Sequence, residues 1–233
     1  MYEEGANMYS VIILSGGKGT RMAMQLPKQY VLLGGKPIIM HTVERLEFVD
    51  EVDEIVIVCE NEFVSSLDLM LKQYNICKKV IYATAGKNRQ ESVYNGIQKV
   101  TNDNVIIHEA ARPFVLAEEF KKLIENKAEN VTYGYSIPFT VVKGEDEITA
   151  TLQRSELVNV QLPQKFRCST LKKAHEIARK ENKAFTEDVS MVFELCKEKI
   201  LIMRGSSYNI KITEPIDLHI GEVIYKEQIM GVR

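Results

Sequence analysis

The fold of this chain is indicated most clearly by the stretch Ser10-Val-Ile-Ile-Leu-Ser-Gly-Gly-Lys-Gly-Thr-Arg21. Its opening residues form a short apolar run that stops at a glycine-rich turn, which is typical of a buried β-strand. In an open α/β sheet, ligands bind beyond the carboxyl ends of the strands. Glycines let the backbone turn tightly and bring its N–H groups close to phosphate oxygens. The stretch therefore predicts an anion-binding loop at the end of a buried strand.

The same alternation continues as far as residue 108. Apolar, β-branched runs predict further strands at 54–59, 79–83 and 104–108, and amphipathic segments predict helices at 38–48, 62–74 and 89–100. Continuous apolar strands that alternate with helices indicate an α/β fold with a mostly parallel central sheet and helices on both faces.

Beyond residue 130 the alternation breaks. A strand is expected at 132–138, and the polar but strand-like segment 139–160, with a turn at Gly144-Glu-Asp146, predicts a projecting β-arm of the kind that often pairs subunits. Helices at 169–180 and 188–197, a strand at 199–204 and a last helix from Pro215 complete the pattern. We expect residues 9–233 to form a single domain, with 139–160 as its arm.

Composition excludes several classes of protein. Thirty basic and 32 acidic residues among 233 give a net charge of -2, so no overall field favours nucleic acid or an anionic membrane. No apolar run reaches the roughly 18 residues needed to span a bilayer, and the first eight residues lack the apolar core of a secretory signal. The four cysteines are far apart, which suits neither zinc nor a disulfide framework. We expect a cytoplasmic protein that binds neither nucleic acid nor membrane.

Two common phosphate-binding motifs do not fit the glycine-rich loop. A P-loop would need glycine where Ile12 stands, and the dinucleotide fingerprint would need its third glycine at Met22. The positive charges of Lys18, Arg21 and Lys28 nevertheless favour a ligand that carries phosphate.

The loop is the first of several motifs that together resemble a known family. The chain resembles 2-C-methyl-D-erythritol 4-phosphate (MEP) cytidylyltransferases, and the related ribitol-5-phosphate cytidylyltransferases, over residues 9–226. The motifs are Ser15-Gly-Gly-Lys-Gly-Thr-Arg-Met22, Pro27-Lys-Gln-Tyr30, Gly35-Lys-Pro37, Arg89-Gln-Glu-Ser-Val93, His108-Glu-Ala-Ala-Arg-Pro113, Leu162-Pro-Gln164, Thr186-Glu-Asp188 and Asn209-Ile-Lys-Ile-Thr213. The resemblance implies a glycosyltransferase-A-like nucleotidyltransferase fold and a homodimer joined by the β-arm.

The resemblance also implies a reaction and the residues that carry it. A phosphate oxygen of a polyol phosphate would attack the α-phosphorus of CTP and expel pyrophosphate, with Mg²⁺ as cofactor. Arg21 and Lys28 would act on the CTP phosphates. The other implied residues are Ser15, Gly16, Gly17, Gly86 and Ser92 for the nucleotide, Glu109 for the metal, and Arg112, Thr140, Arg154 and Lys211 for the acceptor.

Departures from the family pattern gather on the acceptor side. Glu109 stands where the family has aspartate. Phe139 stands in place of the aspartate of the family's Asp-Thr pair, and Leu162 stands in place of the threonine of its Thr-Pro-Gln motif. MEP is the acceptor that the motifs favour, and ribitol 5-phosphate is the alternative. A relative that binds CTP without catalysing transfer is a reading of a different class, and a generic sugar-1-phosphate nucleotidyltransferase fits the later motifs less well.

Overall fold

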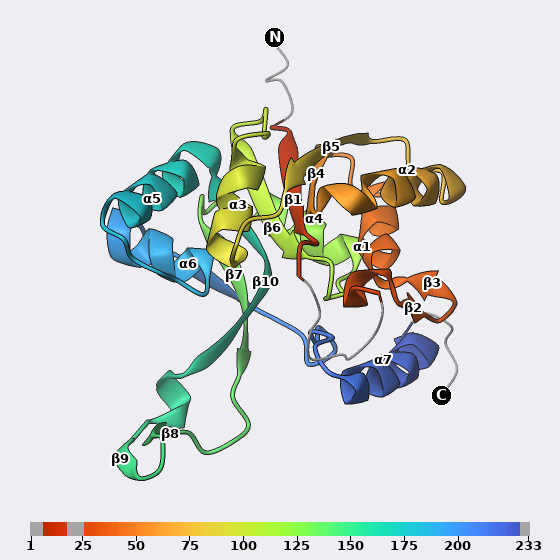
Figure 1. Cartoon of the computed structure of the whole chain (residues 1–233). Helices are drawn as coiled ribbons and strands as arrows, with labels where there is room; N and C mark the ends of the chain where they lie inside the picture. Colours follow the sequence, from red (N-terminus) through yellow and green to blue (C-terminus); the bar gives the residue numbers. More distant parts are fainter. Residues whose placement is uncertain (1–6, 18–25, 229–233) are drawn as a thin grey trace.

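The computed structural model describes residues 7–17 and 26–228, and a twisted seven-stranded sheet forms its centre (Figure 1). The strand order is β11-β7-β10-β6-β1-β4-β5. The strands are β1 (Tyr9–Leu14), β4 (Val52–Cys59), β5 (Lys79–Thr84), β6 (Asn104–Glu109), β7 (Val131–Ser136), β10 (Val158–Arg167) and β11 (Leu201–Arg204). β1 lies between β4 and β6 and is parallel to both, while β10 is antiparallel to both of its neighbours. The predicted mostly parallel sheet is confirmed.

Helices cover both faces of this sheet, as expected. α1 (Ile38–Leu46), α2 (Val64–Gln73) and α4 (Ala117–Glu125) pack on one face, and α3 (Arg89–Ile97), α5 (Cys168–Lys180) and α6 (Asp188–Met191) on the other. Successive side chains of a strand point to opposite faces, so Val11 and Ile13 join the first core and Ile12 the second. Burial of one such side chain stabilises the fold by about 1.5–3 kcal/mol, which explains why the part of β1 from Val11 to Leu14 is apolar throughout.

Shorter elements surround the sheet. The ribbon β2 (Leu32–Leu33) and β3 (Lys36–Pro37) packs against the last helix, α7 (Pro215–Gln228), which starts at the predicted proline. Single turns of 3-10 helix occur at Lys28–Tyr30, Asn61–Phe63 and Arg154–Glu156. The predicted helix 188–197 is α6 followed by a π-helical turn, Val192–Cys196.

Two of the longer elements, β10 and α4, were not predicted from the sequence. β10 is a central strand although it buries Gln161, Gln164 and Lys165. These side chains are hydrogen bonded; Lys165 Nζ, for example, donates to the backbone oxygens of Ile124 and Asn126. α4 was not assigned either, yet it places Phe120 in the core.

The expected β-arm is present. β8 (Val142–Gly144) and β9 (Ile148–Thr151) form their own two-stranded sheet, which stands clear of the rest of the chain in Figure 1. Its apolar side chains have no cover, since Phe139 is 73% and Ile148 69% exposed. The arm begins and ends at β7 and β10, so its last predicted residues already belong to the central sheet.

The four cysteines, all in the described part of the chain, are free thiols; Cys59 is buried, Cys168 and Cys196 are partly buried, and Cys77 is exposed. Across residues 7–17 and 26–228, no helix is long and apolar enough to cross a membrane.

Candidate active site

The glycine-rich loop follows β1 at the carboxyl edge of the sheet, as predicted. Gly16 lies so close to the neighbouring loop that a Cβ atom at this position would be 2.3 Å from the Cβ atom of Ala85. Gln29 Nε2 donates to the backbone oxygens of Ser15 (2.5 Å) and Gly17 (3.2 Å). Because a buried side chain fixes two of its carbonyls, the described part of the loop has a defined shape before any ligand binds.

The loop that opens α3 forms the opposite wall. Asn88 Oδ1 caps the helix by accepting from Glu91 N (2.8 Å). Ser92 Oγ accepts from Gly86 N (3.0 Å) and donates to Asn88 O (2.9 Å). A hydroxyl has two acceptor lone pairs, so Ser92 keeps one for a ligand while its proton holds the loop together.

A pocket of about 520 Å³ lies between these loops, within the roughly 300–1,000 Å³ typical of ligand sites. We name it the strand-end pocket, because it opens where β1 and β6 end. Eight of the twelve predicted site residues line it: Ser15, Gly16, Gly17, Lys28, Gly86, Ser92, Glu109 and Lys211. Arg21 lies outside the described residues.

Three cations surround Glu109 at the end of β6. Lys211 Nζ lies 2.8 Å from its Oε2, Arg89 Nε lies 3.2 Å from its Oε1, and Arg112 Nε lies 3.6 Å from its Oε2. Burial alone would raise the pKa of Glu109, but Lys211, Arg89 and Arg112 together lower it to about 2. Glu109 is therefore ionised at neutral pH.

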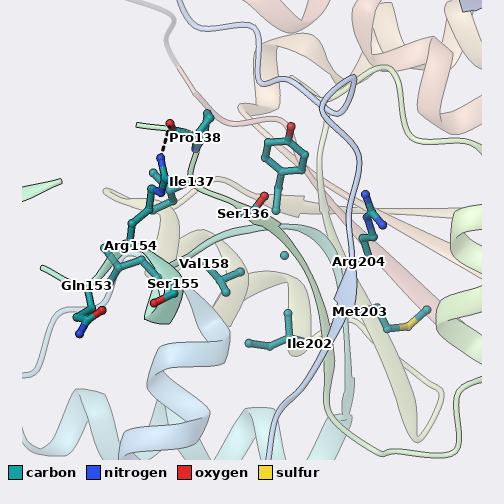
Figure 2. A pocket seen from close by; sticks show the side chains of 13 residues that line it. Ser136, Ile137, Pro138, Gln153, Arg154, Ser155, Val158, Ile202, Met203 and Arg204 are labelled. Carbon is teal, nitrogen blue, oxygen red and sulfur yellow. Dashed lines mark hydrogen bonds between the residues drawn. The ribbon is translucent and has the colours of Figure 1, made fainter. Parts of the chain in front are cut away.

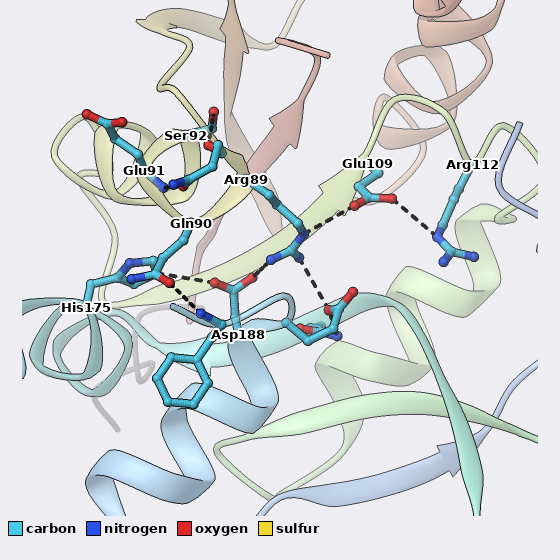
Figure 3. Close-up of polar contacts among 12 residues, drawn as sticks. Arg89, Gln90, Glu91, Ser92, Glu109, Arg112, His175 and Asp188 are labelled. Atoms are coloured by element: carbon cyan, nitrogen blue, oxygen red, sulfur yellow. Dashed lines mark hydrogen bonds and ion pairs between the residues drawn. The ribbon is translucent and has the colours of Figure 1, made fainter. Parts of the chain in front are cut away.

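Arg89 extends this cluster toward α6 (Figure 3). Its guanidinium contacts Asp188 Oδ2 at 2.7 Å and Glu187 Oε2 at 3.4 Å, in addition to Glu109. Asp188 is 1% exposed and also pairs with His175 Nε2 at 3.2 Å. Burial acts to raise the pKa of Asp188, but Arg89 and His175 outweigh it and the pKa is lowered. The cluster thus ties the end of β6 to α3, α5 and α6.

Arg89, Glu187 and Asp188 were not predicted to be site residues. They lie in two of the motifs that carry the family resemblance, 89–93 and 186–188. The chemistry of Arg89 could have indicated its acidic partners. An arginine in the first turn of a predicted helix needs such partners if it is buried. The spacing of about 100 residues hid which acids those are.

Lys211 reaches the pocket on an extended segment that is not a β-strand. Ile212 N donates to Ala111 O (2.8 Å) and Arg112 NH1 donates to Asn209 O (2.9 Å). Side chains nevertheless alternate along this segment, since Ile212 is buried while Lys211 lines the pocket. Backbone pairing to the turn after β6 thus sets the position of Lys211.

The two predicted site residues on the arm lie elsewhere. Thr140 is exposed, and Arg154 NH1 donates to Pro138 O (3.2 Å). Arg154 borders a cavity of about 940 Å³ between the base of the arm and β11, where Arg204 also lies (Figure 2). Neither residue lines the strand-end pocket of its own chain.

Comparison with known proteins agrees with this geometry. The family model described as 2-C-methyl-D-erythritol 4-phosphate cytidylyltransferase matches residues 9–227. The chain is 36% identical to the chloroplastic enzyme of that name from Oryza sativa subsp. japonica, over 94% of this chain and 75% of that one. It is 32% identical to the ribitol-5-phosphate cytidylyltransferase of Lactiplantibacillus plantarum, over 93% and 97% of the two chains.

Among solved structures, 4-diphosphocytidyl-2C-methyl-D-erythritol synthase from Anaerococcus prevotii superposes with a TM-score of 0.84 at 25% identity, covering 95% of this chain and 97% of that one. The family match spans the glycine-rich loop, the acidic end of β6 and the Lys211 segment alike. The chain therefore belongs to the 2-C-methyl-D-erythritol 4-phosphate cytidylyltransferase family.

Proposed function

We propose that this protein transfers CMP from CTP to 2-C-methyl-D-erythritol 4-phosphate and releases pyrophosphate, a step of isoprenoid precursor synthesis. The observation that carries the proposal is the strand-end pocket, which joins a glycine-rich loop of defined shape to Lys28 and Lys211. Family membership and the names of the relatives support it.

The chemistry needs positive charge and positioning, and no general base. A phosphate oxygen of the acceptor forms a bond to the α-phosphorus of CTP, and the bond from that phosphorus to the bridging oxygen breaks as pyrophosphate leaves. The second pKa of a phosphomonoester is about 6, so the nucleophile is already anionic at neutral pH. Lys28 and Arg21 neutralise charge that develops on the nucleotide, and Lys211 presents the acceptor phosphate. The Ser15–Gly17 loop and Gly86 with Ser92 hold the nucleoside.

We also propose Mg²⁺ as the cofactor, with Glu109 as its protein ligand, directly or through water. Glu109 Oε2 is buried and, among the described residues, receives no hydrogen bond of good geometry. The described residues include no cluster of three or more metal-ligating side chains, which suits an ion that takes one or two carboxylates and fills its shell with phosphate oxygens and water. When bound, Mg²⁺ supplies charge neutralisation on the triphosphate.

We further propose that the protein acts in the cytoplasm as a homodimer in which the arm of one copy completes the site of the other. Thr140 and Arg154 are exposed on the arm and lie away from their own pocket. A mixture of two inactive variants tests this. In a dimer of Lys28→Ala with Arg154→Ala, one site keeps both residues only if the arm acts in trans. Recovered activity in the mixture is expected, and no recovery would mean that Arg154 acts within its own chain.

Pyrophosphate release from CTP with each polyol phosphate in turn tests the activity itself. We expect turnover with MEP. Ribitol 5-phosphate is the second candidate, because a relative of that name aligns over almost the whole chain and the buried Leu162 stands in a motif that carries threonine in the family. Turnover with ribitol 5-phosphate alone would replace MEP as the acceptor. CTP binding without pyrophosphate release from any acceptor would indicate a catalytically silent relative.

A further inference from the structure

We propose that Glu187 recognises a hydroxyl group of the acceptor's polyol chain and thereby selects the acceptor. This inference rests on the proposed function, because it concerns the second substrate of the same reaction. It starts from a second cavity of about 510 Å³, which we name the acceptor-side cavity. Arg112, Glu187, and the base of the arm at 135–139 and 158–160 line it.

The acceptor-side cavity and the strand-end pocket share one wall of charged side chains. Arg89 lines the strand-end pocket and contacts Glu109 there, while its NH2 group lies 3.4 Å from Glu187 Oε2. Arg112 lines the acceptor-side cavity and contacts the same Glu109 carboxylate at 3.6 Å. The two spaces are therefore adjacent, separated by two guanidinium groups. This is the placement that transfer requires, since the acceptor must reach the nucleotide's α-phosphorus from beside it.

In the described structure, hydrogen bonds from the protein reach only one of the two carboxyl oxygens of Glu187. Both of its hydrogen bonds in the described structure reach Oε2, from Gln164 Nε2 at 3.0 Å and from Arg89. Oε1 receives none from the described residues, and 25% of the side chain remains exposed. A carboxyl oxygen that receives no hydrogen bond can accept one, so Oε1 matches an alcohol O–H.

The rest of the lining makes Glu187 selective. Ile137, Pro138, Phe139, Val158 and Val160 contribute apolar side chains, so Glu187 and Arg112 are the charged groups of the cavity. Glu187 offers an acceptor and Arg112 offers donors, which together suit the hydroxyls of a polyol. The acceptor then lies with its hydroxyl end toward Glu187 and its phosphate toward Lys211. Glu187 thus fixes both the direction and the length of the chain that fits.

Steady-state pyrophosphate release tests this with Glu187→Gln, which keeps the shape of the side chain and a carbonyl oxygen for Gln164. A hydrogen bond to a charged group is worth about a tenfold to hundredfold change in affinity. We expect the acceptor KM to rise by that factor while the KM for CTP stays within about twofold of wild type. Glu181→Gln is the matched control, because Glu181 is an exposed glutamate that pairs with Lys183 and lines neither space; it should change neither KM.

Acceptor analogues that each lack one hydroxyl separate recognition from a merely structural role. In the wild type, one analogue should have a kcat/KM about tenfold or more below that of the parent acceptor. In Glu187→Gln, the kcat/KM values of the parent acceptor and of that analogue should be nearly equal. The proposal is overturned if no single hydroxyl matters in the wild type, if every analogue loses equally in both proteins, or if the KM for CTP rises together with that for the acceptor. The wild-type series can overturn the proposal by itself, because the absence of any hydroxyl dependence contradicts it even where the variant does not fold. Absence of turnover with every polyol phosphate would overturn the proposed function as well, whereas turnover without coupling to Glu187 overturns this inference alone.

Discussion

Replacement of Asp188 by asparagine should remove the anchor of the charge cluster behind the active site. Asp188 is almost fully buried and pairs with Arg89 at 2.7 Å and with His175 at 3.2 Å. Loss of one partner of a buried ion pair leaves the other charge uncompensated, which costs about 3–5 kcal/mol. The lowered pKa of Asp188 means that its contribution is fully present above the carboxyl's unfolded value of 3.8 and is lost as the pH falls through the folded value. At pH 7 the whole effect should therefore be seen.

Urea unfolding at pH 7 measures the loss in the free energy of unfolding, and thermal unfolding measures the matching change in melting temperature. For a chain of this size, about 3–5 kcal/mol corresponds to a fall in melting temperature of roughly 6–20 °C. Glu181→Gln is again the control, since Glu181 and Lys183 are both about half exposed and a solvent-exposed ion pair of this kind contributes little to stability. The double variant of Asp188→Asn with Arg89→Met should lose less than the sum of the two single changes, because the second change removes the stranded charge. A loss below about 1 kcal/mol for Asp188→Asn, or strict additivity, would refute this reasoning.

Three further predictions concern the nucleotide, the metal and the acid limb of stability. Lys28→Ala should raise the barrier by about 3–4 kcal/mol, as loss of preorganised charge does; a kcat/KM within twofold of wild type would exclude Lys28 from the chemistry. Glu109→Asp should preserve or raise Mg²⁺-dependent activity, and complete loss in a magnesium titration would show that the site requires the longer side chain. Burial lowers the pKa of His41 to about 4 from 6.5, so the unfolded chain binds the extra proton and stability should fall by up to about 3 kcal/mol between pH 7 and pH 4. His41→Gln should flatten that dependence in urea unfolding curves, and an unchanged slope would contradict the assignment.

The elements that were predicted correctly from the sequence are those whose buried side chains are mainly apolar and need no hydrogen-bond partner elsewhere in the chain. Val11, Ile12 and Ile13 must all be buried, and a run of this kind fits only a strand covered on both sides. β10 escaped prediction because it buries polar residues such as Gln161 and Lys165, and the side-chain nitrogen of each donates to a backbone oxygen far away in the sequence. A hydropathy pattern shows that a side chain is polar, but it cannot show that the folded chain supplies a hydrogen-bond partner for it.

The same limit applied to the site. The loop at Ser15 and the lysine at 28 follow from local chemistry, and the structure brings them to one pocket with Glu109. The Arg89–Asp188 pair spans 99 positions along the chain, so only tertiary structure joins it. The positions of Arg154 and Thr140 outside the pocket follow from the arm, whose geometry no local pattern specifies.

The spread of the charge cluster along the chain has a consequence for how the protein is made. Arg89 and Glu109 leave the ribosome together with β1, β4, β5 and β6, but Asp188 and Lys211 follow only after β10 has been made. Until β10 is made, the early half also has an open sheet edge at β6, the strand with which β10 pairs. The early half is therefore left without its full set of ionic partners until the segment that carries Lys211 is made, so the nucleotide site is completed after β10 has covered the sheet edge at β6.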